Sequence, residues 1–530
     1  MRENRPYGSV GGWGLASPPP TQSMSLIAER LDHPASLLGI IRPWIPLTHS
    51  STFELPTMKI QWQRSSLWSR YCESLKPICL ISAVTCNLST LAIAQQPTIT
   101  PKASEVQEPG LRIDDLGLDG KTHAWAWSDE EVRAAGTGFW PQYRGPSGDG
   151  QAPEGCDPPT EWNEDKNVLW KLTIPGKAWS SPVVWGDKIW LTNATQDGLT
   201  MSVLAVDRQT GKVLIDRPIF KNEVTQKDYH EFNSYGSPTP ICDGKHVYVT
   251  FGAYGTAALN PQDASVVWER RDLPCNHYRG AGASPILYGN LLIFAMDGFD
   301  TQYVVALDKR TGKTVWKQDR NIEYGTDDGD WKKAYSTPHI IEVAGQRQLI
   351  SPAAKAVIAY DPQTGKLLWK VRYEEHSSAI RPLFDGKHLF ISSGFSKAKL
   401  LSIRPDGMGD VTDSHVVWQA TRAIGCKPSP VFLGGRICSL EDRGVLSAMD
   451  PASGEVVWQK RLGGDFSSSP VVAAGKLYCF DEQGRSHVVD AEGNVLAENT
   501  LDAGCLASPA IVGNDLIVRT RTSLYCIGKK

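Results

Sequence analysis

The chain has 530 residues, of which 41% are hydrophobic and 21% are charged, so it is long and apolar enough to bury a large core. Its formal net charge of −3 provides no basic field for a phosphate backbone, which argues against nucleic acid as a partner. The low overall hydropathy excludes a membrane protein with many spanning helices.

The first part of the chain predicts an exported protein. A basic stretch follows Met58, and the mainly apolar run 77–94 ends in Ala-x-Ala before a polar residue. This order of segments is typical of a secretory signal peptide. We therefore interpret 58–94 as the signal peptide of a secreted, periplasmic or cell-surface protein, and 1–57 as an over-extended reading frame or a disordered leader. Polar residues such as Asn87 make the apolar run a poor permanent span, so we expect no integral membrane span in the mature chain.

Residues 95–138 are rich in proline, glycine and acidic side chains, which predicts a linker. Trp125 and Trp127 are the residues of this segment that are candidates for docking on the following domain. We place that domain at 139–530.

Within 139–530 the chain repeats a proline, usually after a small residue, ahead of an apolar strand. The prolines are Pro182, Pro238, Pro285, Pro338, Pro382, Pro430, Pro470 and Pro509. Between them, short apolar runs alternate with turns rich in Gly, Asp and Asn, as half-buried antiparallel strands require. Repeats of roughly 40 to 50 residues built from short strands are typical of β-propellers. The sequence therefore predicts an all-β fold, an eight-bladed β-propeller of four-stranded antiparallel blades.

The last repeat has only three predicted strands, and a fourth is available before the first repeat. The segment 167–174 carries Trp170 ahead of Pro182 at the same spacing that separates Trp418 from Pro430. Pairing this strand into the last blade removes open edges that otherwise favour aggregation. We expect this N-terminal strand to close the ring.

Most outer strands end in a tryptophan, namely Trp170, Trp268, Trp316, Trp369, Trp418 and Trp458. A large flat ring at the edge of a blade can fill the wedge between neighbouring blades, where its burial stabilises the fold. We predict that these tryptophans are structural; the alternative is a stacking platform for a ligand.

Two segments, 306–316 (ALDKRTGKTVW) and 359–369 (AYDPQTGKLLW), resemble the tryptophan-docking repeat of the PQQ-like β-propeller superfamily. Looser copies lie at 205–215, 258–268 and 448–458. The superfamily contains quinoprotein alcohol and glucose dehydrogenases, and also non-enzymatic members such as the periplasmic lipoprotein that assists outer-membrane β-barrel assembly. The opening WPQYRGP at 140–146, followed by WSSP at 179–182, is similar to uncharacterised secreted bacterial members.

The resemblance implies one of two functions. The first is a non-enzymatic scaffold or ligand-binding protein of the cell envelope, whose partner is an envelope protein or a small-molecule or sugar ligand. The second is a PQQ-dependent dehydrogenase that oxidises an alcohol or sugar and needs PQQ and calcium. The chain lacks the C-x-x-C-H motif for covalent haem and the adjacent cysteine pair of many quinoprotein alcohol dehydrogenases. We therefore favour the non-enzymatic function, with no bound metal.

Three successive connections between an outer strand and the next inner strand are enlarged, after Ile215, Trp268 and Trp316. They lie on the same rim of a propeller, and long loops on a rigid scaffold are where function concentrates. The ligand-binding candidates on these loops are His230, Glu231, Tyr235, His277, Tyr278, Arg279, Trp331 and Lys333. The alternative is a solvated polar rim.

Other residues near this rim have two interpretations each. The run 327–330 (DDGD) is a calcium loop or, since it lacks the ligand spacing of a calcium hand, an acidic turn. Arg381 and Lys427 point into the channel or cap turns. In an enzyme, the candidate base and stacking wall are Glu231, Asp300 or Asp330, and Trp331 or Trp179.

Overall fold

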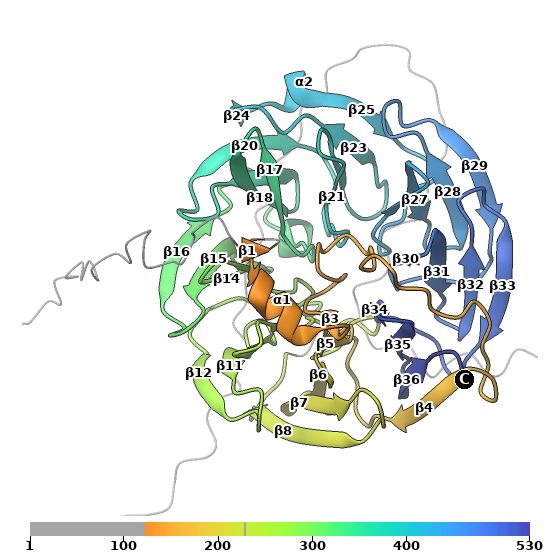
Figure 1. The fold of residues 1–530 in the computed structure, drawn as a ribbon. Coiled ribbons are helices and arrows are strands. Elements are labelled where there is room, and N and C mark those ends of the chain that lie inside the picture. Colours follow the sequence, from red (N-terminus) through yellow and green to blue (C-terminus); the bar gives the residue numbers. More distant parts are fainter. Residues whose placement is uncertain (1–121, 124, 227–228) are drawn as a thin grey trace, which may run out of the picture. The chain divides into compact units, whose positions relative to one another are not determined.

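Eight β-sheets stand around a central channel in the computed structural model, which describes residues 122–123, 125–226 and 229–530 (Figure 1). The first strand of each sheet lies towards the channel and the last lies at the rim (Figure 1). The predicted all-β fold, an eight-bladed propeller of four-stranded antiparallel blades, is confirmed. The predictions for 1–57, 58–94 and most of the linker lie outside the described residues.

The blades are numbered in chain order. Blade 1 contains β5 (Val183–Trp185), β6 (Lys188–Ala194), β7 (Thr200–Asp207) and β8 (Val213–Lys221). Blade 2 contains β9 (Ile241–Cys242), β10 (Val247–Thr250), β11 (Thr256–Leu259) and β12 (Val266–Arg270). Blade 3 contains β13 (Ile286–Tyr288), β14 (Leu291–Asp297), β15 (Gln302–Asp308) and β16 (Thr314–Asp319). Blade 4 contains β17 (His339–Val343), β18 (Gln346–Pro352), β19 (Ala356–Tyr360) and β20 (Leu367–Arg372).

The second half of the ring follows the same plan. Blade 5 contains β21 (Leu383–Phe384), β22 (Leu389–Ser392), β23 (Leu400–Ile403) and β25 (Val416–Ala420). Blade 6 contains β26 (Val431–Leu433), β27 (Arg436–Leu440), β28 (Val445–Met449) and β29 (Val456–Arg461). Blade 7 contains β30 (Val471–Ala473), β31 (Lys476–Phe480), β32 (Arg485–Val489) and β33 (Val495–Thr500). Blade 8 contains β34 (Ala510–Val512), β35 (Asp515–Arg519), β36 (Ser523–Ile527) and β4 (Val168–Thr173).

A few short elements lie outside this plan. They are β1 (Thr122–His123), β2 (Trp127–Ser128), α1 (Asp129–Ala135), β3 (Phe139–Trp140), η2 (Gly329–Lys332), β24 (Gly409–Asp410) and α2 (Thr412–His415). Strand β3 pairs with β5 on the inner side of blade 1, and β24 pairs with the outer strand β20 of blade 4.

The hydrophobic core lies between the blades. All residues of β14 are buried, whereas in the outer strand β16 only Trp316 is buried. Buried side chains of neighbouring blades belong to common clusters, as Ile293 of β14 and Ile358 of β19 do. The inner strands are mostly apolar because both of their faces are covered by adjacent blades, so each blade depends on its neighbours for burial.

The strand that precedes blade 1 supplies the fourth strand of blade 8. Strand β4 pairs antiparallel with β36, with Trp170 opposite Cys526. A register shift follows this pair, as it follows the pair Ala306 and Trp316 in blade 3. Trp170 therefore has the position in blade 8 that Trp316 has in blade 3.

Five of the six predicted docking tryptophans make the same contact with the next blade. The indole N–H donates to a carbonyl of the neighbouring turn, as in Trp316 Nε1 to Pro362 O at 3.1 Å. The equivalent bonds of Trp170, Trp268, Trp418 and Trp458 measure 2.9, 2.9, 3.0 and 3.0 Å. A Cβ on the turn glycine Gly365, which has a φ of +71°, would lie 2.6 Å from the Trp316 ring, so this turn needs glycine for both reasons.

Trp369 differs because blade 5 has a longer connection at the corresponding turn. Its indole N–H donates to Gln348 Oε1 at 2.8 Å, and Gln348 Nε2 donates to Pro405 O at 2.9 Å. Gln348 thus bridges the tryptophan to the next blade, so the connection between the blades is kept.

The structure corrects one of the eight repeat prolines. In seven blades the inner strand begins directly after the proline that the repeat predicts, but β9 begins at Ile241, after Pro240. The proline of blade 2 is therefore Pro240, not Pro238. Both follow a small residue, Thr239 and Ser237, so the pattern alone selects the wrong one.

The segment 139–151 closes the channel at the end opposite to the enlarged connections. Arg144 donates to the carbonyls of Pro430 and Pro470 at 2.9 and 3.3 Å, and Arg381 donates to Tyr143 O at 2.5 Å. A Cβ on Gly148 would lie 2.3 Å from Arg381 Cζ, so the segment fits tightly. We call 139–151 the plug.

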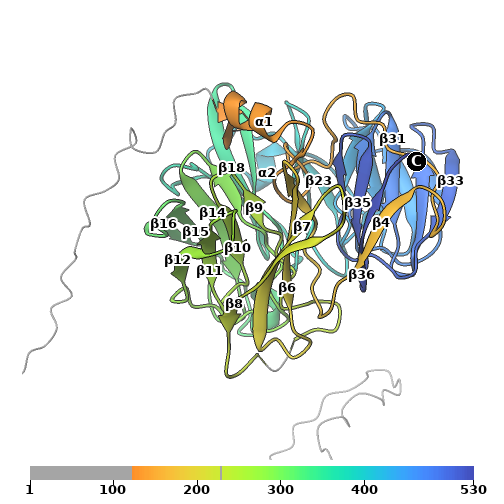
Figure 2. The ribbon, with the colours of Figure 1, turned by 60° about the horizontal axis from the view of Figure 1, so that its bottom comes forward.

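The end of the predicted linker packs on the same face as the plug. Trp127 is buried, and its indole N–H donates to Cys242 O at 2.8 Å. The Trp125 ring lies 4.4 Å from the Arg347 guanidinium. A capping box between Ser128 and Glu131 starts α1, which lies at one end of the ring (Figures 1 and 2).

Candidate functional site

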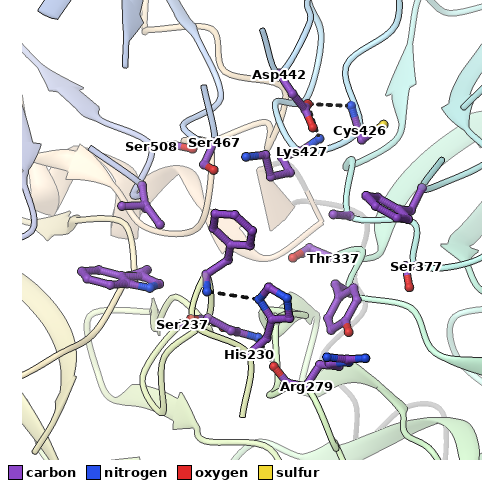
Figure 3. A pocket seen from close by; sticks show the side chains of 18 of the residues that line it. His230, Ser237, Arg279, Thr337, Ser377, Cys426, Lys427, Asp442, Ser467 and Ser508 are labelled. Atoms are coloured by element: carbon purple, nitrogen blue, oxygen red, sulfur yellow. Dashed lines mark hydrogen bonds between the residues drawn. The ribbon is translucent and has the colours of Figure 1, made fainter. Parts of the chain in front are cut away.

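A cavity of about 710 Å³ opens on the channel axis, on the face that carries the enlarged connections. All eight blades contribute to its wall, each through the connection that leads to its inner strand, and Tyr143 of the plug reaches it from below. Such a concave, mixed polar and aromatic cavity is typical of a ligand-binding site. We call it the axial funnel (Figure 3).

Two of the eight sequence-predicted residues line the axial funnel, His230 and Arg279 (Figure 3). His230 Nδ1 accepts a hydrogen bond from Phe232 N at 3.2 Å, and its ring stacks on Phe232. Arg279 donates to Asp330 Oδ2 at 3.3 Å, and this contact raises the pKa of Arg279. The loops before blades 2 and 3 therefore each supply one of the predicted side chains.

Four predicted residues pack within the enlarged connections instead of lining the funnel. Tyr235 stacks on Tyr229 with ring centroids 4.0 Å apart, and the Tyr278 ring lies under Arg279. Lys333 is fully buried, and its Nζ donates to the Tyr335 hydroxyl. Burial lowers the pKa of Lys333 to about 7.

His277 is the fourth of these internal residues. Its Nδ1 lies 3.7 Å from Cys275 Sγ, and its Nε2 is buried with no partner among the described residues. Burial is the main cause that lowers the pKa of His277 to about 4, so the ring is neutral at pH 7.

The remaining two predicted residues are exposed and lie beside the funnel. Glu231 accepts a hydrogen bond through its backbone carbonyl from Lys177 Nζ at 3.1 Å. Trp331 in η2 stacks on His376 with ring centroids 4.5 Å apart, and His376 itself lines the funnel. Trp331 therefore positions a funnel residue.

Blades 6 to 8 supply charged side chains that the sequence analysis missed. Glu482 accepts from Lys427 Nζ at 2.9 Å, from Ser467 Oγ at 2.5 Å and from Arg521 Nη2 at 3.3 Å. The Glu482 side chain is only 7% exposed, whereas Lys427 and Arg521 are 33% and 43% exposed, so the carboxylate is the desolvated member of this network. It links three blades across one side of the funnel.

Two further carboxylates of the funnel are engaged in the same way. Asp442 Oδ1 accepts from the backbone N–H groups of Cys426 and Lys427 at 2.9 and 3.1 Å (Figure 3). Asp465 pairs with Arg443 at 3.1 Å.

The sequence places these carboxylates at equivalent positions of two neighbouring repeats. The connection between the second and third strands reads EDRG at 441–444 in blade 6 and DEQG at 481–484 in blade 7. These connections lie on the same rim as the enlarged ones, but their ordinary length gave no reason to select them.

Aromatic side chains flank the mouth of the funnel. Phe232 from the loop before blade 2 is 55% exposed, and Phe395 between β22 and β23 is 58% exposed. Lys427 Nζ of blade 6 lies 5.2 Å from the centre of the Phe232 ring. Side chains from opposite sides of the propeller therefore meet at this point. Exposed rings of this kind offer apolar faces to a ligand.

Hydroxyl side chains surround the floor of the funnel, at the residue before each repeat proline. Each accepts a hydrogen bond from the backbone N–H of the preceding blade, as Ser284 Oγ does from Thr239 N at 2.9 Å. The ring of hydroxyls consists of Ser181, Thr239, Ser284, Thr337, Ser429, Ser469 and Ser508. Arg381 occupies the eighth position, in blade 5.

The structure also decides between the two interpretations given above for the run 327–330 and for Arg381 and Lys427. In the run 327–330, Asp328 accepts from Asp330 N at 3.0 Å and caps η2, so the run is an acidic turn. Arg381 is held by the plug, whereas Lys427 lines the funnel. Among the described residues, no group of three or more His, Cys, Asp or Glu side chains could hold a metal ion.

The sequence matches the model of a known protein family. The model of a family described as outer membrane protein assembly factor BamB matches residues 159–298, 300–423 and 408–524, which together are more than half of the chain. The chain belongs to this family. The predicted membership of the PQQ-like propeller superfamily is thereby confirmed.

Solved structures with TM-scores above 0.5 include two dehydrogenases. The quinohemoprotein alcohol dehydrogenase of Comamonas testosteroni is 12% identical with a TM-score of 0.56, over 77% of this chain and 83% of that chain. A europium-containing methanol dehydrogenase is 13% identical with a TM-score of 0.52, over 74% and 91%. BamB from Moraxella catarrhalis is 12% identical with a TM-score of 0.49, over 68% and 99%. At these identities the likeness concerns the fold alone.

No curated protein matches the chain significantly. Within the described part of the chain, no helix is both long and apolar enough to cross a membrane.

Proposed function

We propose that this protein is a non-catalytic ligand-binding propeller of the cell envelope, which holds a small polar ligand in the axial funnel. The observation that carries the proposal is that the funnel carboxylates already have partners. Asp330 pairs with Arg279, Asp465 pairs with Arg443, and Glu482 accepts from two cations and a hydroxyl. A ligand therefore contacts fixed hydrogen-bonding groups and aromatic faces, which suit binding without a catalysed reaction.

A PQQ-dependent dehydrogenase needs a metal site and a free carboxylate base, and the residues present do not fit this group. Calcium binds to several oxygen ligands, often carboxylates, and the described residues contain no group of three or more His, Cys, Asp or Glu side chains that could hold a metal ion. Of the candidate bases, Asp300 lies outside the funnel and accepts from the backbone N–H groups of Asn276 and Thr301. Glu231 also lies outside the funnel, and Asp330 is paired with Arg279. We therefore propose that the funnel works without PQQ and calcium.

The envelope location rests on two sequence features. The segment 58–94 has the order of a secretory signal peptide, and the family is described as an outer membrane protein assembly factor. Mass spectrometry of the mature protein is expected to find its N-terminus at or near Gln95. A peptide from 1–57 in the mature protein contradicts this part of the proposal.

Ligand binding is tested by calorimetry and by the melting temperature with a panel of sugars, organic acids and PQQ with calcium. We expect a sugar or an organic acid to bind and to raise the melting temperature, because a ligand stabilises the state that binds it. Phe232→Ser and Phe395→Ser are expected to weaken binding about fivefold each, because each removes an aromatic face of the mouth. Met408→Ser is the control, since Met408 is 88% exposed outside the funnel.

The same panel decides between the two functions. Stoichiometric binding of PQQ, with reduction of an artificial electron acceptor by an alcohol or sugar, contradicts the non-catalytic function and establishes the dehydrogenase. Binding of a ligand without reduction of the acceptor supports the proposal. If no compound of the panel binds, ligand binding in the funnel is wrong.

An envelope protein is the second candidate ligand, and the exposed aromatic side chains at the mouth favour it. Large exposed aromatic residues are frequent anchors of protein interfaces. Purified partner protein, once identified by cross-linking through a photoreactive residue at position 232, is expected to bind Phe232→Ser and Trp331→Ser more weakly than the wild type. Unchanged affinity of both variants contradicts a partner at the mouth.

A further inference from the structure

Most hydroxyls of the ring at the floor of the axial funnel have a proton that no described residue accepts. Each hydroxyl accepts one backbone N–H, as Ser508 Oγ does from Ser469 N at 3.0 Å. A hydroxyl has one donor besides its acceptor lone pairs. Five of these hydroxyls line the funnel, on Ser181, Thr239, Ser284, Thr337 and Ser508. None of the five donates its proton to another described residue, so five O–H donors are available at one floor.

Three buried guanidinium groups lie next to this floor. Arg381 occupies the eighth ring position itself, and Arg519 donates to Ser180 Oγ at 2.8 Å, one residue from the ring hydroxyl of Ser181. Arg144 donates to the carbonyls of Pro430 and Pro470, each one residue after a ring hydroxyl. All three side chains are at most 3% exposed. The ring of hydroxyls therefore has three buried positive charges beside it, and that of Arg519 lies next to a hydroxyl that lines the funnel.

None of these three guanidinium groups has a carboxylate partner among the described residues. Their acceptors are carbonyls and, for Arg381 and Arg519, also the side-chain oxygens of Gln142, Ser180 and Asn193. Asp149 is the one carboxylate whose charge acts on Arg144 and Arg381, and its Oδ1 is engaged with Gln151 N at 3.1 Å.

The charges of this cluster act on the neighbouring His339. Burial lowers the pKa of Arg381 and of Arg519 to about 9, so both stay charged at neutral pH. Burial, together with the charges of Arg381 and Arg144, lowers the pKa of His339 to about 3. The region behind the floor therefore disfavours a further positive charge and favours a negative one.

We infer that the floor of the axial funnel binds an oxyanion, such as the carboxylate, sulfate or phosphate group of an organic ligand. This inference rests on the proposed ligand-binding function and names the charged end of the ligand. The ligand inserts its oxyanion between the hydroxyls of the floor and keeps its polar body at the mouth, between Phe232 and Phe395. Hydroxyl donors backed by fixed positive charge are an established way to bind oxyanions without a metal ion.

The test compares two probes that differ at one carbon, glucose and glucuronate, by calorimetry at low ionic strength. We expect glucuronate to bind at least tenfold more tightly than glucose, because hydrogen bonds to a charged acceptor are stronger than those to a neutral one. Sulfate is expected to compete with glucuronate, since it presents the same oxyanion chemistry without the sugar. Equal affinities of the two sugars, or a failure of sulfate to compete, overturn the inference.

Two ring variants provide a matched pair. Ser284→Ala and Ser429→Ala each remove one hydroxyl that accepts a backbone N–H, at 2.9 and 3.0 Å, but only Ser284 lines the funnel. We expect Ser284→Ala to bind glucuronate about tenfold more weakly and Ser429→Ala to bind it as the wild type does. Equal losses in both variants contradict a role of the floor hydroxyls. Ser508→Ala replaces Ser284→Ala if the latter does not fold.

The outcomes separate this inference from the function on which it rests. If a neutral compound binds in the funnel and anionic compounds bind no better, ligand binding stands and the oxyanion floor is wrong. If no compound binds, both are wrong. If sulfate or glucuronate binds and Ser284→Ala weakens it, both are supported.

Discussion

The axial funnel has two sectors that differ in how they use their loops. The long-loop sector consists of the enlarged connections 222–240, 271–285 and 320–338, and the short-loop sector consists of the shorter connections of the funnel wall in blades 5 to 8 and in blade 1. Most of the extra length in the long-loop sector packs against itself, as the stacked Tyr229 and Tyr235 and the buried Lys333 show. The short-loop sector has no room for internal packing, and therefore directs side chains such as Glu482 to the funnel.

This difference shows that loop length marks a rim without marking the residues that line it. A long loop must bury part of its own side chains to be ordered, because an unpacked loop loses conformational entropy without compensation. A tight turn is ordered by its backbone alone, so its side chains remain available. The polar composition of a long loop is therefore a weaker indication of a site than the same residues in a short turn of a repeat.

The largest expected effect is a loss of unfolding free energy, and it tests whether tryptophan docking stabilises the blades of both sectors equally. Trp316 docks under the long-loop sector and Trp458 docks under the short-loop sector, with indole hydrogen bonds of 3.1 and 3.0 Å to the next blade. We expect Trp316→Ala and Trp458→Ala each to lower the free energy of unfolding by about 3–5 kcal/mol, as measured by urea denaturation, because each removes a large ring from between two blades. Trp331→Ala, at an exposed position, is the control and is expected to cost less than about 1 kcal/mol.

A clear difference between the two docking variants contradicts a uniform scaffold. If Trp458→Ala costs less than about 1 kcal/mol while Trp316→Ala costs about 3 kcal/mol or more, the short-loop sector is held by its ion pairs rather than by tryptophan docking.

The scaffold is the part of the molecule that the sequence predicts best. Trp316 and its turn glycine Gly365 repeat with the period of the blades, and each repeat has the same physical task of filling the wedge to its neighbour. Errors arise where two residues satisfy one pattern, as Pro238 and Pro240 do. Repetition therefore predicts the ring and its packing, but not every register.

The candidate site is predicted less well because its residues are brought together around an axis rather than along the chain. His230 and Lys427 are almost 200 residues apart in sequence and both line the funnel. The plug is a further example, since nothing local in 139–151 indicates that Arg144 is buried in the channel. Only the position of a residue within its repeat carries this information.

The second prediction compares the ion pairs of the two sectors. Glu482 is 7% exposed and accepts from Lys427, Arg521 and Ser467, whereas Asp330 is 33% exposed and pairs with Arg279 alone among the described cations. We expect Glu482→Gln to lower the free energy of unfolding by about 2 kcal/mol, because it removes a buried charged acceptor that two cations and a hydroxyl share. Asp330→Asn is the matched variant and is expected to cost less than about 1 kcal/mol, as for an exposed pair.

Urea denaturation at pH 7 measures the loss of unfolding free energy in both variants. The contrast between the sectors predicts the larger loss for Glu482→Gln. If Asp330→Asn destabilises the protein as much as Glu482→Gln does, the long-loop sector depends on its rim charges, and the contrast between the sectors is wrong. An increase in ionic strength is expected to reduce the smaller effect further, because salt screens exposed charges more than buried ones.

The smallest effect is a pH dependence that belongs to the long-loop sector. Burial lowers the pKa of Lys333 to about 7, while in the unfolded chain it keeps a value of about 10.4. Between these values the unfolded state binds more protons than the folded state, so the free energy of unfolding rises with pH. From pH 7 to pH 8 this single group is expected to contribute a rise of about 1 kcal/mol.

Lys333→Met isolates this contribution, because methionine fills a similar volume without the charge. The variant is expected to be more stable than the wild type at pH 7 and to lose the rise between pH 7 and pH 8, whereas Lys366→Met, at an exposed turn position, keeps it. The interval ends at pH 8 because the buried cysteines, whose pKa values burial raises, act in the opposite direction at higher pH. His277, with a pKa of about 4, acts only below about pH 6.5. A rise that persists in Lys333→Met comes from another group and contradicts the lowered pKa of Lys333.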